Sequence, residues 1–164
     1  MAKKFLLAVF ALFALTMQAQ VEPEVSETVE LMSILSHMAG FEEYNMDMGG
    51  QYIEDIESSF ASFKEHPIIS HLQGLREQYG ISYNAPMDLA VNLVIDGQRI
   101  KFIGDKNCMD GRWMNVDIDN FVDQLNQFYS DTRFHEFYQQ HQDFYQEVLR
   151  QYKTNINLWE KIMQ

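Results

Sequence analysis

IDNFVDQLNQFYSDTRFHEFYQQHQDFYQEVLRQY, the stretch from Ile118 to Tyr152, decides the fold class of this protein. Apolar residues recur there every three or four positions, the period that places them on one face of a helix. The first series predicts a helix over 118–130 and comprises Ile118, Phe121, Val122, Leu125, Phe128 and Tyr129. The second predicts one long helix, capped by Asp131 or Thr132, with a stripe about 140° wide that comprises Phe134, Phe137, Tyr138, His141, Phe144, Tyr145, Val148, Leu149 and Tyr152.

Three more helices are predicted upstream, because each apolar series there is bounded by residues that begin or end a helix. Ser26 opens the first of them, which ends at Gly40. The second covers 52–65 and stops before His66-Pro67, since the residue before a proline avoids helical geometry. The third runs from that proline to Gly80.

Residues 84–103 predict a short helix near 86–90 that leads into a β-hairpin. Two runs rich in β-branched residues, 91–95 and 99–103, flank Asp96-Gly97. An Asp-Gly pair between such runs is a strong hairpin signal. The following residues, 104–116, are expected to form a loop. The predicted fold is therefore mainly α, a compact bundle of about five or six helices with one short β-hairpin near 91–103.

The start of the chain predicts export. Lys3 and Lys4 precede an unbroken apolar run over 5–15, and small Ala19 follows it. This is the pattern of a secretory signal peptide, and the run is too short to span a bilayer, although an uncleaved anchor is the alternative. We expect a signal peptide at 1–19, an extended lead at 20–27 and a helical domain at 28–164. The mature protein would be periplasmic or extracellular, with no membrane span after cleavage.

The composition restricts the possible functions. The 164 residues are enough for one domain, and 24 acidic against 12 basic side chains give a net charge of −12. Nucleic acid is an unsuitable partner, because its binding requires a surplus of basic side chains, whereas a basic protein would suit this charge. Cys108 is the single cysteine and cannot form an intramolecular disulfide, so we expect a buried thiol.

The histidines do not form a complete metal-binding motif. His135-Glu136-Phe137-Tyr138-Gln139 comes within one residue of His-Glu-x-x-His, the zinc-peptidase pattern, but Gln139 replaces the second His. His141 cannot replace it, because six helical residues turn it about 240° from His135, and we expect a hydrogen-bonded core residue instead. His66 and His71 are about 140° apart on a helix, so His66 is expected to cap the helix junction.

An acidic segment has part of the spacing of a calcium loop. Asn115-x-Asp117-x-Asp119 matches its first positions, but Asn120 and Asn126 replace the glycine and the closing glutamate. A helix that begins with acidic residues explains the same pattern through the helix dipole. We therefore expect no catalytic residue and no cofactor. The weak candidates for metal binding are His66, His71, His135, Asp117 and Asp119.

Several blocks of this sequence resemble a family of uncharacterised exported bacterial proteins, known as a domain of unknown function. The most specific block is Ala39-Gly40-Phe41-Glu42-Glu43-Tyr44-Asn45. The others are Glu30–Leu35, the helix from Tyr52 to Phe63 with His66-Pro67, Gly80–Met87, Arg112-Trp113 and the aromatic series from Phe128 to Phe137. Together they cover most of residues 28–160.

Longer members of that family continue with a His-Glu-Phe-x-His segment and resemble zinc-dependent peptidases. No residue of this chain matches that segment, so no catalytic residue is carried over. The resemblance implies a non-catalytic N-terminal domain, the scaffold or the substrate-side part of a zinc-peptidase-like protein, with a downstream peptidase-like domain as its partner. The alternative is a self-standing acidic module that binds a protein or another ligand.

Overall fold

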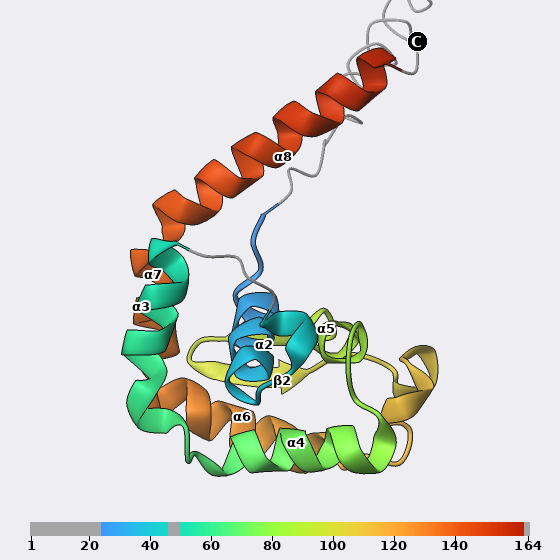
Figure 1. The fold of residues 1–164 in the computed structure, drawn as a ribbon. Helices are drawn as coiled ribbons and strands as arrows, with labels where there is room; N and C mark the ends of the chain where they lie inside the picture. Colours follow the sequence, from blue (N-terminus) through green and yellow to red (C-terminus); the bar gives the residue numbers. More distant parts are fainter. Residues whose placement is uncertain (1–23, 46–49, 163–164) are drawn as a thin grey trace, which may run out of the picture.

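The computed structural model describes residues 24–45 and 50–162 (Figure 1). The α-helices are α2 (Glu27–Met38), α3 (Gln51–Phe60), α4 (Pro67–Tyr79), α5 (Ala85–Ala90), α6 (Ile118–Asp131), α7 (Phe134–Gln140) and α8 (Gln142–Ile162). The strands are β1 (Leu93–Asp96) and β2 (Arg99–Phe102), and the 3-10 helices are η1 (Glu42–Tyr44), η2 (Ala61–Phe63), η3 (Lys106–Cys108) and η4 (Gly111–Trp113). The predicted fold class is confirmed: these residues are mainly α, with seven α-helices and one antiparallel hairpin.

Helix α2 lies at the centre of the body, and the other elements surround it. Its side chains Leu31, Met32 and Leu35 are fully buried. Helices α4 and α6 run side by side beneath it, and α5 packs against it (Figure 1). The Thr28 hydroxyl donates to the carbonyl of Ala90 at 3.0 Å, so α2 and the end of α5 are joined by a buried hydrogen bond as well as by apolar contacts.

The hairpin forms where the Asp-Gly pair predicts it, with Asp96 opposite Arg99. Gly97 has a φ of 65°, which glycine adopts without the steric cost that a side chain brings. Asn126 of α6 fixes strand β2, because its amide accepts the N–H of Ile100 at 2.7 Å and donates to the carbonyl of Ile100 at 2.9 Å. The outer edge of this strand is therefore paired with a helix side chain.

The long helix predicted at the end of the chain is in fact two helices, α7 and α8, separated at His141. An unbroken helix would pair the backbone N–H of His141 with the carbonyl of Phe137. Instead, the imidazole Nδ1 of His141 lies 2.8 Å from that carbonyl, and the backbone N–H donates to Tyr138 at 3.3 Å. The side chain thus replaces a backbone donor, and the chain changes direction there.

Helix α7 completes the core, whereas most of α8 leaves the body (Figure 1). Phe134 and Phe137 are buried, and their rings lie 5.9 and 5.0 Å from that of Phe60 on α3. Phe137 and Phe144 both belong to the apolar stripe that the sequence predicts, but only Phe137 is part of the core, and Phe144 is exposed.

Two further expectations need correction. Residues 104–116 contain the short helices η3 and η4 rather than a loop alone. Cys108 is exposed, contrary to the prediction of a buried thiol, because the neighbouring Met109 is the side chain that turns toward the core.

The N-terminal predictions fall largely on residues that the structure does not describe. The predicted signal peptide, 1–19, and the first part of the predicted lead, 20–23, lie outside the described residues. Ser26 precedes α2 as expected, but its hydroxyl bonds to the Thr28 hydroxyl at 2.9 Å rather than capping the helix. Among the described residues, no helix has the length and apolar character needed to cross a membrane.

Candidate functional site

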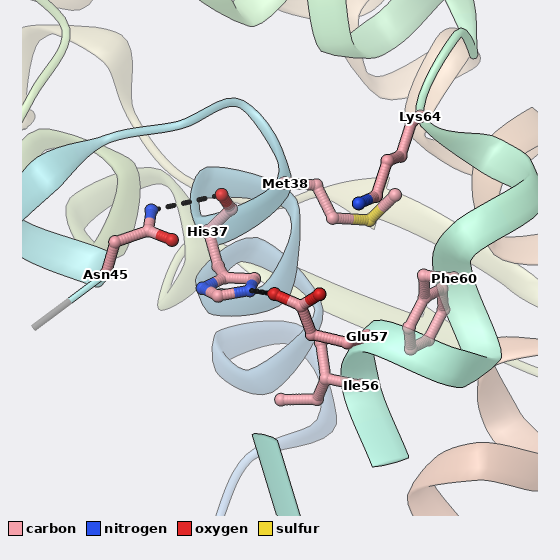
Figure 2. A pocket seen from close by; sticks show the side chains of 7 residues that line it. All are labelled: His37, Met38, Asn45, Ile56, Glu57, Phe60 and Lys64. Atoms are coloured by element: carbon pink, nitrogen blue, oxygen red, sulfur yellow. Dashed lines mark hydrogen bonds and ion pairs between the residues drawn. The ribbon is translucent and has the colours of Figure 1, made fainter. Parts of the chain in front are cut away.

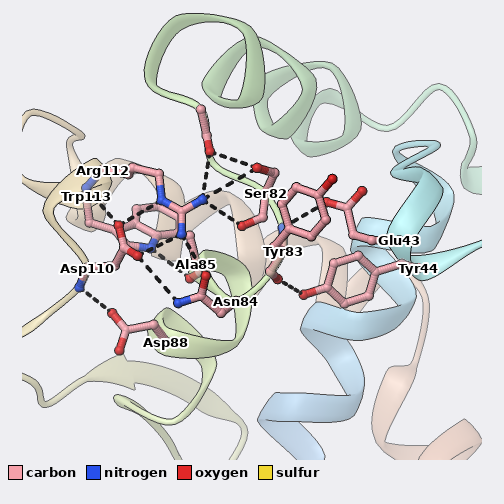
Figure 3. A network of polar contacts seen from close by, with 11 residues as sticks. Glu43, Tyr44, Ser82, Tyr83, Asn84, Ala85, Asp88, Asp110, Arg112 and Trp113 are labelled. Carbon is pink, nitrogen blue, oxygen red and sulfur yellow. Dashed lines mark hydrogen bonds and ion pairs between the residues drawn. The ribbon is translucent and has the colours of Figure 1, made fainter.

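Arg112 is the centre of a polar network on the body of the protein (Figure 3). Its guanidinium binds both carboxylate oxygens of Asp110, at 2.8 and 2.7 Å. The same group donates to the carbonyls of Gly80 and Ser82 at 3.1 and 2.9 Å, and to the side chain of Asn84 at 2.8 Å. Asp110 also begins η4 by accepting the backbone N–H of Arg112. One side chain therefore joins η4 to the segment between α4 and α5.

Arg112 and Asp110 each keep the other in its charged form. The bonds from Arg112 hold the pKa of the Asp110 carboxyl far below its ordinary value, and they raise the pKa of Arg112. A bidentate pair of this kind is stronger than a neutral hydrogen bond and fixes the relative orientation of its two partners. The pair therefore sets the geometry of the whole network.

Tyr83 lies beside this network in the left-handed region, with a φ of 53°. Its backbone N–H donates to the Glu43 carboxylate at 2.8 Å, and its carbonyl accepts the Tyr44 hydroxyl at 2.5 Å. A side chain in this region carries a steric cost, which persists where surrounding bonds impose the conformation. The residue as a whole is 67% exposed. Two side chains of η1, Glu43 and Tyr44, thus hold Tyr83 in a costly conformation (Figure 3).

Glu43 connects η1 to α4. Burial works to raise the pKa of Glu43, but the Tyr83 N–H and the Arg76 guanidinium together leave it below its ordinary value. Arg76 lies 3.2 Å from the Glu43 carboxylate and 4.5 Å from the ring centroid of Phe41, so it makes an ion pair and a cation–π contact at once. The carboxylate therefore stays ionised while it holds the Tyr83 backbone.

Trp113 anchors the network to the core. It is fully buried, its indole N–H donates to the carbonyl of Ala85 at 2.8 Å, and its ring meets Phe121 edge-on at 5.9 Å. The blocks 39–45, 80–87 and 112–113, which are far apart in the chain, thus meet at one place. These are three of the blocks that carry the family resemblance. Sequence reasoning identified the blocks but assigned none of them to a site, because nothing in their spacing predicts that they meet.

The cost of the Tyr83 conformation can be measured with two substitutions that both remove the ring. We expect Tyr83→Gly to be more stable than Tyr83→Ala by about 1 kcal/mol, because only glycine adopts a positive φ without strain. Urea unfolding of the two variants measures the difference. An alanine variant as stable as the glycine variant would show that the backbone relaxes out of the left-handed region.

A small cleft lies beside Asn45, the residue that follows η1 (Figure 2). It has a volume of about 210 Å³, and it is lined by His37, Met38, Asn45, Ile56, Glu57, Phe60 and Lys64. The Nδ1 atom of His37 lies 3.2 Å from the Tyr44 carbonyl, and its Nε2 atom lies 3.7 Å from the Glu57 carboxylate. Tyr44 links the cleft to the network, because its carbonyl contacts His37 and its hydroxyl contacts Tyr83.

The five candidates for metal binding are divided among the start of α4 (His66 and His71), the start of α6 (Asp117 and Asp119) and α7 (His135). His66 caps α4, as predicted, by accepting the N–H of Ile68 at 3.3 Å, and it lies 3.6 Å from Asp131. Asp117 caps α6 by accepting the N–H of Asn120 at 3.1 Å. The sequence interpretation of this acidic segment as a helix start is therefore supported by the hydrogen bond at Asp117.

The other candidates have different surroundings. His135 pairs with Glu27 at 3.0 Å, at a cleft of about 510 Å³, and Asp119 is exposed on α6. His71 and Asp117 line one cleft of about 330 Å³. Within residues 24–45 and 50–162, no three His, Cys, Asp or Glu side chains are grouped as metal ligands would be. His141 is a hydrogen-bonded, largely buried residue, as expected, with its Nε2 atom 3.2 Å from Asp55.

A comparison with known protein families gives a match over nearly the whole chain. The family model described as a domain of unknown function, DUF4932, matches residues 21–164. The chain belongs to the DUF4932 family. No curated protein and no solved structure matches it significantly. The network around Arg112 lies entirely within the DUF4932 region, and the function of this family is unknown.

Proposed function

We propose that this DUF4932 chain is an exported, non-catalytic domain that acts as the N-terminal scaffold or substrate-side part of a zinc-peptidase-like protein. The observation that carries the proposal is the structural use of its polar side chains. His66 and Asp117 cap helices, His135 pairs with Glu27, and Arg112 joins segments of the body. Polar side chains that stabilise the fold in this way are what a scaffold domain requires.

The proposed partner is the downstream peptidase-like domain that the resemblance implies. A basic protein is the other partner that the net charge of −12 would suit. The exposure of Tyr83 favours a second candidate function, a self-standing module that binds a protein or another ligand. Tyrosine is enriched at protein interfaces, and this one is kept in a costly conformation by Glu43 and Tyr44.

Zinc content and peptidase activity test the non-catalytic part of the proposal. The expected mature form, residues 20–164, should bind no stoichiometric zinc after dialysis against zinc and should not cleave casein or a mixed peptide library. Elemental analysis and the appearance of new peptides by mass spectrometry are the measurements. Bound zinc together with hydrolysis that His135→Ala abolishes would overturn the proposal. His37→Ala is the matched control, because His37 also faces a glutamate but belongs to no zinc-peptidase-like segment.

The sequence of the neighbouring gene distinguishes the scaffold proposal from the proposal of a self-standing module. The scaffold proposal expects an adjacent reading frame, or a continuation of this one, that encodes His-Glu-x-x-His. Co-purification of the two products, with and without an affinity tag on this chain, then tests their association. An unrelated neighbour and no co-purification would favour the self-standing module instead.

A further inference from the structure

A partly buried carboxylate, that of Glu30, lies where helices α2, α3 and α8 meet. The Tyr52 hydroxyl of α3 donates to this carboxylate, and the Tyr145 hydroxyl of α8 lies 2.9 Å from that of Tyr52. A hydroxyl has one proton to donate, and Tyr52 donates it to Glu30, so Tyr145 donates to Tyr52. The three side chains, the Glu30 cluster, therefore form one series of hydrogen bonds from α8 through α3 to α2.

The Glu30 cluster fixes the start of α8 just after the break between α7 and α8 at His141. Tyr145 is buried, and the neighbouring Phe144 stacks on the Tyr52 ring with a centroid distance of 4.3 Å. From this point α8 runs away from the body (Figure 1). The contacts of Tyr52 and Tyr145 therefore set the direction in which the long helix projects.

The ionised form of Glu30 is costly in this position. An ionised carboxylate can accept about four hydrogen bonds, whereas the Tyr52 hydroxyl is the donor that the described part of the chain gives to Glu30. Burial raises the pKa of Glu30 above its ordinary value of 4.5, although the Tyr52 hydrogen bond and the charge of His141 act in the opposite direction. The neutral carboxyl therefore fits this position better than the carboxylate does.

The tyrosines that face Glu30 stay neutral at physiological pH. Burial and the nearby Glu30 carboxylate raise the pKa of Tyr52 and that of Tyr145 well above the ordinary value. Tyr138 of α7 lies next to Tyr145, with the ring centroids 5.3 Å apart, and its hydroxyl donates to the carbonyl of Val25. These hydroxyls therefore act as hydrogen-bond donors and do not change charge when Glu30 does.

The charged groups near the cluster have partners of their own. Glu27 of α2 lies 3.0 Å from His135, and the Nε2 atom of His141 lies 3.2 Å from Asp55 of α3. Hydrogen bonds from Gln51 and His141 lower the pKa of Asp55. A carboxyl shifted in this direction stabilises the fold above its unfolded pKa of about 3.9 and stops doing so in stronger acid. Asp55 therefore acts in the direction opposite to that of the buried carboxyl.

We propose that Glu30 is a proton-binding group that controls how firmly α3 and α8 are held to the body, so that protonation tightens the attachment and ionisation loosens it. Both forms of the carboxyl can bond to Tyr52, but only the ionised form gains strongly from leaving the cluster for water. A carboxyl with a raised folded pKa contributes its full stabilisation below its unfolded pKa of about 4.3 and loses it as the pH rises through the folded pKa. The attachment is therefore firmest in mild acid and weaker at neutral pH.

The choice of side chain supports this role. A glutamine at position 30 would have the same length and would offer a carbonyl oxygen to the Tyr52 hydroxyl without a charge. At pH 7 it would hold the three helices at least as firmly as the carboxylate does. The glutamate therefore adds a dependence on pH that glutamine lacks, and this dependence is the same in a scaffold and in a self-standing module.

Hydrogen exchange of the mature form, residues 20–164, tests the proposal. Protection factors, corrected for the intrinsic exchange rate, are measured between pH 5 and pH 8 for the amides of α3 and of the first two turns of α8. In the wild-type chain they should fall by about threefold or more from pH 5 to pH 8. In Glu30→Gln they should change by less than about 1.5-fold and exceed the wild-type values at pH 8.

Two control variants exclude other sources of the pH dependence. Glu54→Gln removes an exposed glutamate of the same helix α3 and should keep the wild-type behaviour. Asp55→Asn removes the carboxylate that faces His141 and should also keep it. A pH dependence that Glu30→Gln retains, or that Asp55→Asn abolishes, would belong to His141 and would overturn the proposal.

A titration of the unchanged chain decides the matter if circular dichroism shows that Glu30→Gln does not fold. Carbon-13 NMR of the side-chain carboxyls follows Glu30 directly. Its midpoint should lie above 4.5 and coincide with the midpoint of the change in protection. A midpoint at or below 4.5, or a wild-type protection that is constant between pH 5 and pH 8, would contradict the proposal.

Discussion

Replacing Trp113 by alanine is expected to lower the free energy of unfolding by about 4 kcal/mol, because loss of a buried tryptophan leaves a large cavity. Trp113 is fully buried against Phe121. Its indole N–H also satisfies the carbonyl of Ala85, which would lose its donor. The expected loss is a large part of the total stability of a domain of this size. Urea unfolding followed by far-ultraviolet circular dichroism is the measurement.

Two further substitutions separate packing from the hydrogen bond at this position. Trp113→Phe keeps an aromatic ring but removes the donor, so we expect it to cost less than Trp113→Ala, about 2 kcal/mol. Met114→Ala is the matched control, because Met114 is adjacent but 45% exposed, and it should change the stability by less than about 0.5 kcal/mol. A Trp113→Ala variant as stable as Met114→Ala would contradict the role of Trp113 as an anchor.

Replacing Arg112 by alanine is expected to cost about 3 kcal/mol, because a partly buried carboxylate loses its bidentate partner and two backbone carbonyls each lose one of their hydrogen bonds. The affected groups are Asp110 and the carbonyls of Gly80 and Ser82. Arg112→Lys should recover only part of the loss, since an ammonium group cannot bind Asp110 with two parallel bonds while it reaches both carbonyls. The free energy of unfolding in urea at pH 7 measures both effects.

The pH dependence of the same variant provides a second readout. The pKa of Asp110 is held below its unfolded value of about 3.9. A group shifted in this direction stabilises the fold above the unfolded pKa, and the stabilisation is lost as the pH falls through the folded pKa. The difference in the free energy of unfolding between the wild-type chain and Arg112→Ala should therefore have its full size at pH 7 and become smaller below about pH 4. A difference that stays constant to low pH would show that the ion pair is not its source.

Exposed arginines provide the control for this experiment. Arg133 pairs with Glu136, and its side chain is 73% exposed. Exposed ion pairs contribute little to stability, so Arg133→Ala should cost less than about 0.5 kcal/mol. If Arg112→Ala costs no more than this, the network does not hold the three segments together.

The positions of the helices could be read from local pattern. The apolar period of α6, the Asp-Gly pair between β1 and β2, and the proline that opens α4 each predicted the element that forms. These signals act over a few residues, because periodicity, turn geometry and the restriction before proline are properties of neighbouring residues. The sequence did not predict the break at His141. There the imidazole of His141 lies against the carbonyl of Phe137, which would accept the backbone N–H of His141 in an unbroken helix.

The candidate site was not predictable in the same way. Glu43, Tyr83 and Arg112 are separated by long stretches of chain, and their hydrogen bonds follow from how α2, α4 and α5 pack. Tyr83 has no sequence signal for its positive φ, which glycine or asparagine would have suggested. For the metal candidates the opposite holds: their spacing suggested ligands, whereas in the structure His66 and Asp117 cap helices and His135 pairs with Glu27.

The sequence by itself determined the fold class, most helix boundaries, the hairpin and an acidic surface. Tertiary structure decided that three distant segments meet around Arg112 and that Cys108 rather than Met109 faces solvent. It also decided that the apolar stripe is buried at Phe134 and Phe137 of α7 but exposed at Val148 and Tyr152 of α8. The physical reason is the range of the interactions. A helical stripe specifies that one face is apolar, but only the packing of the other elements determines whether that face is covered.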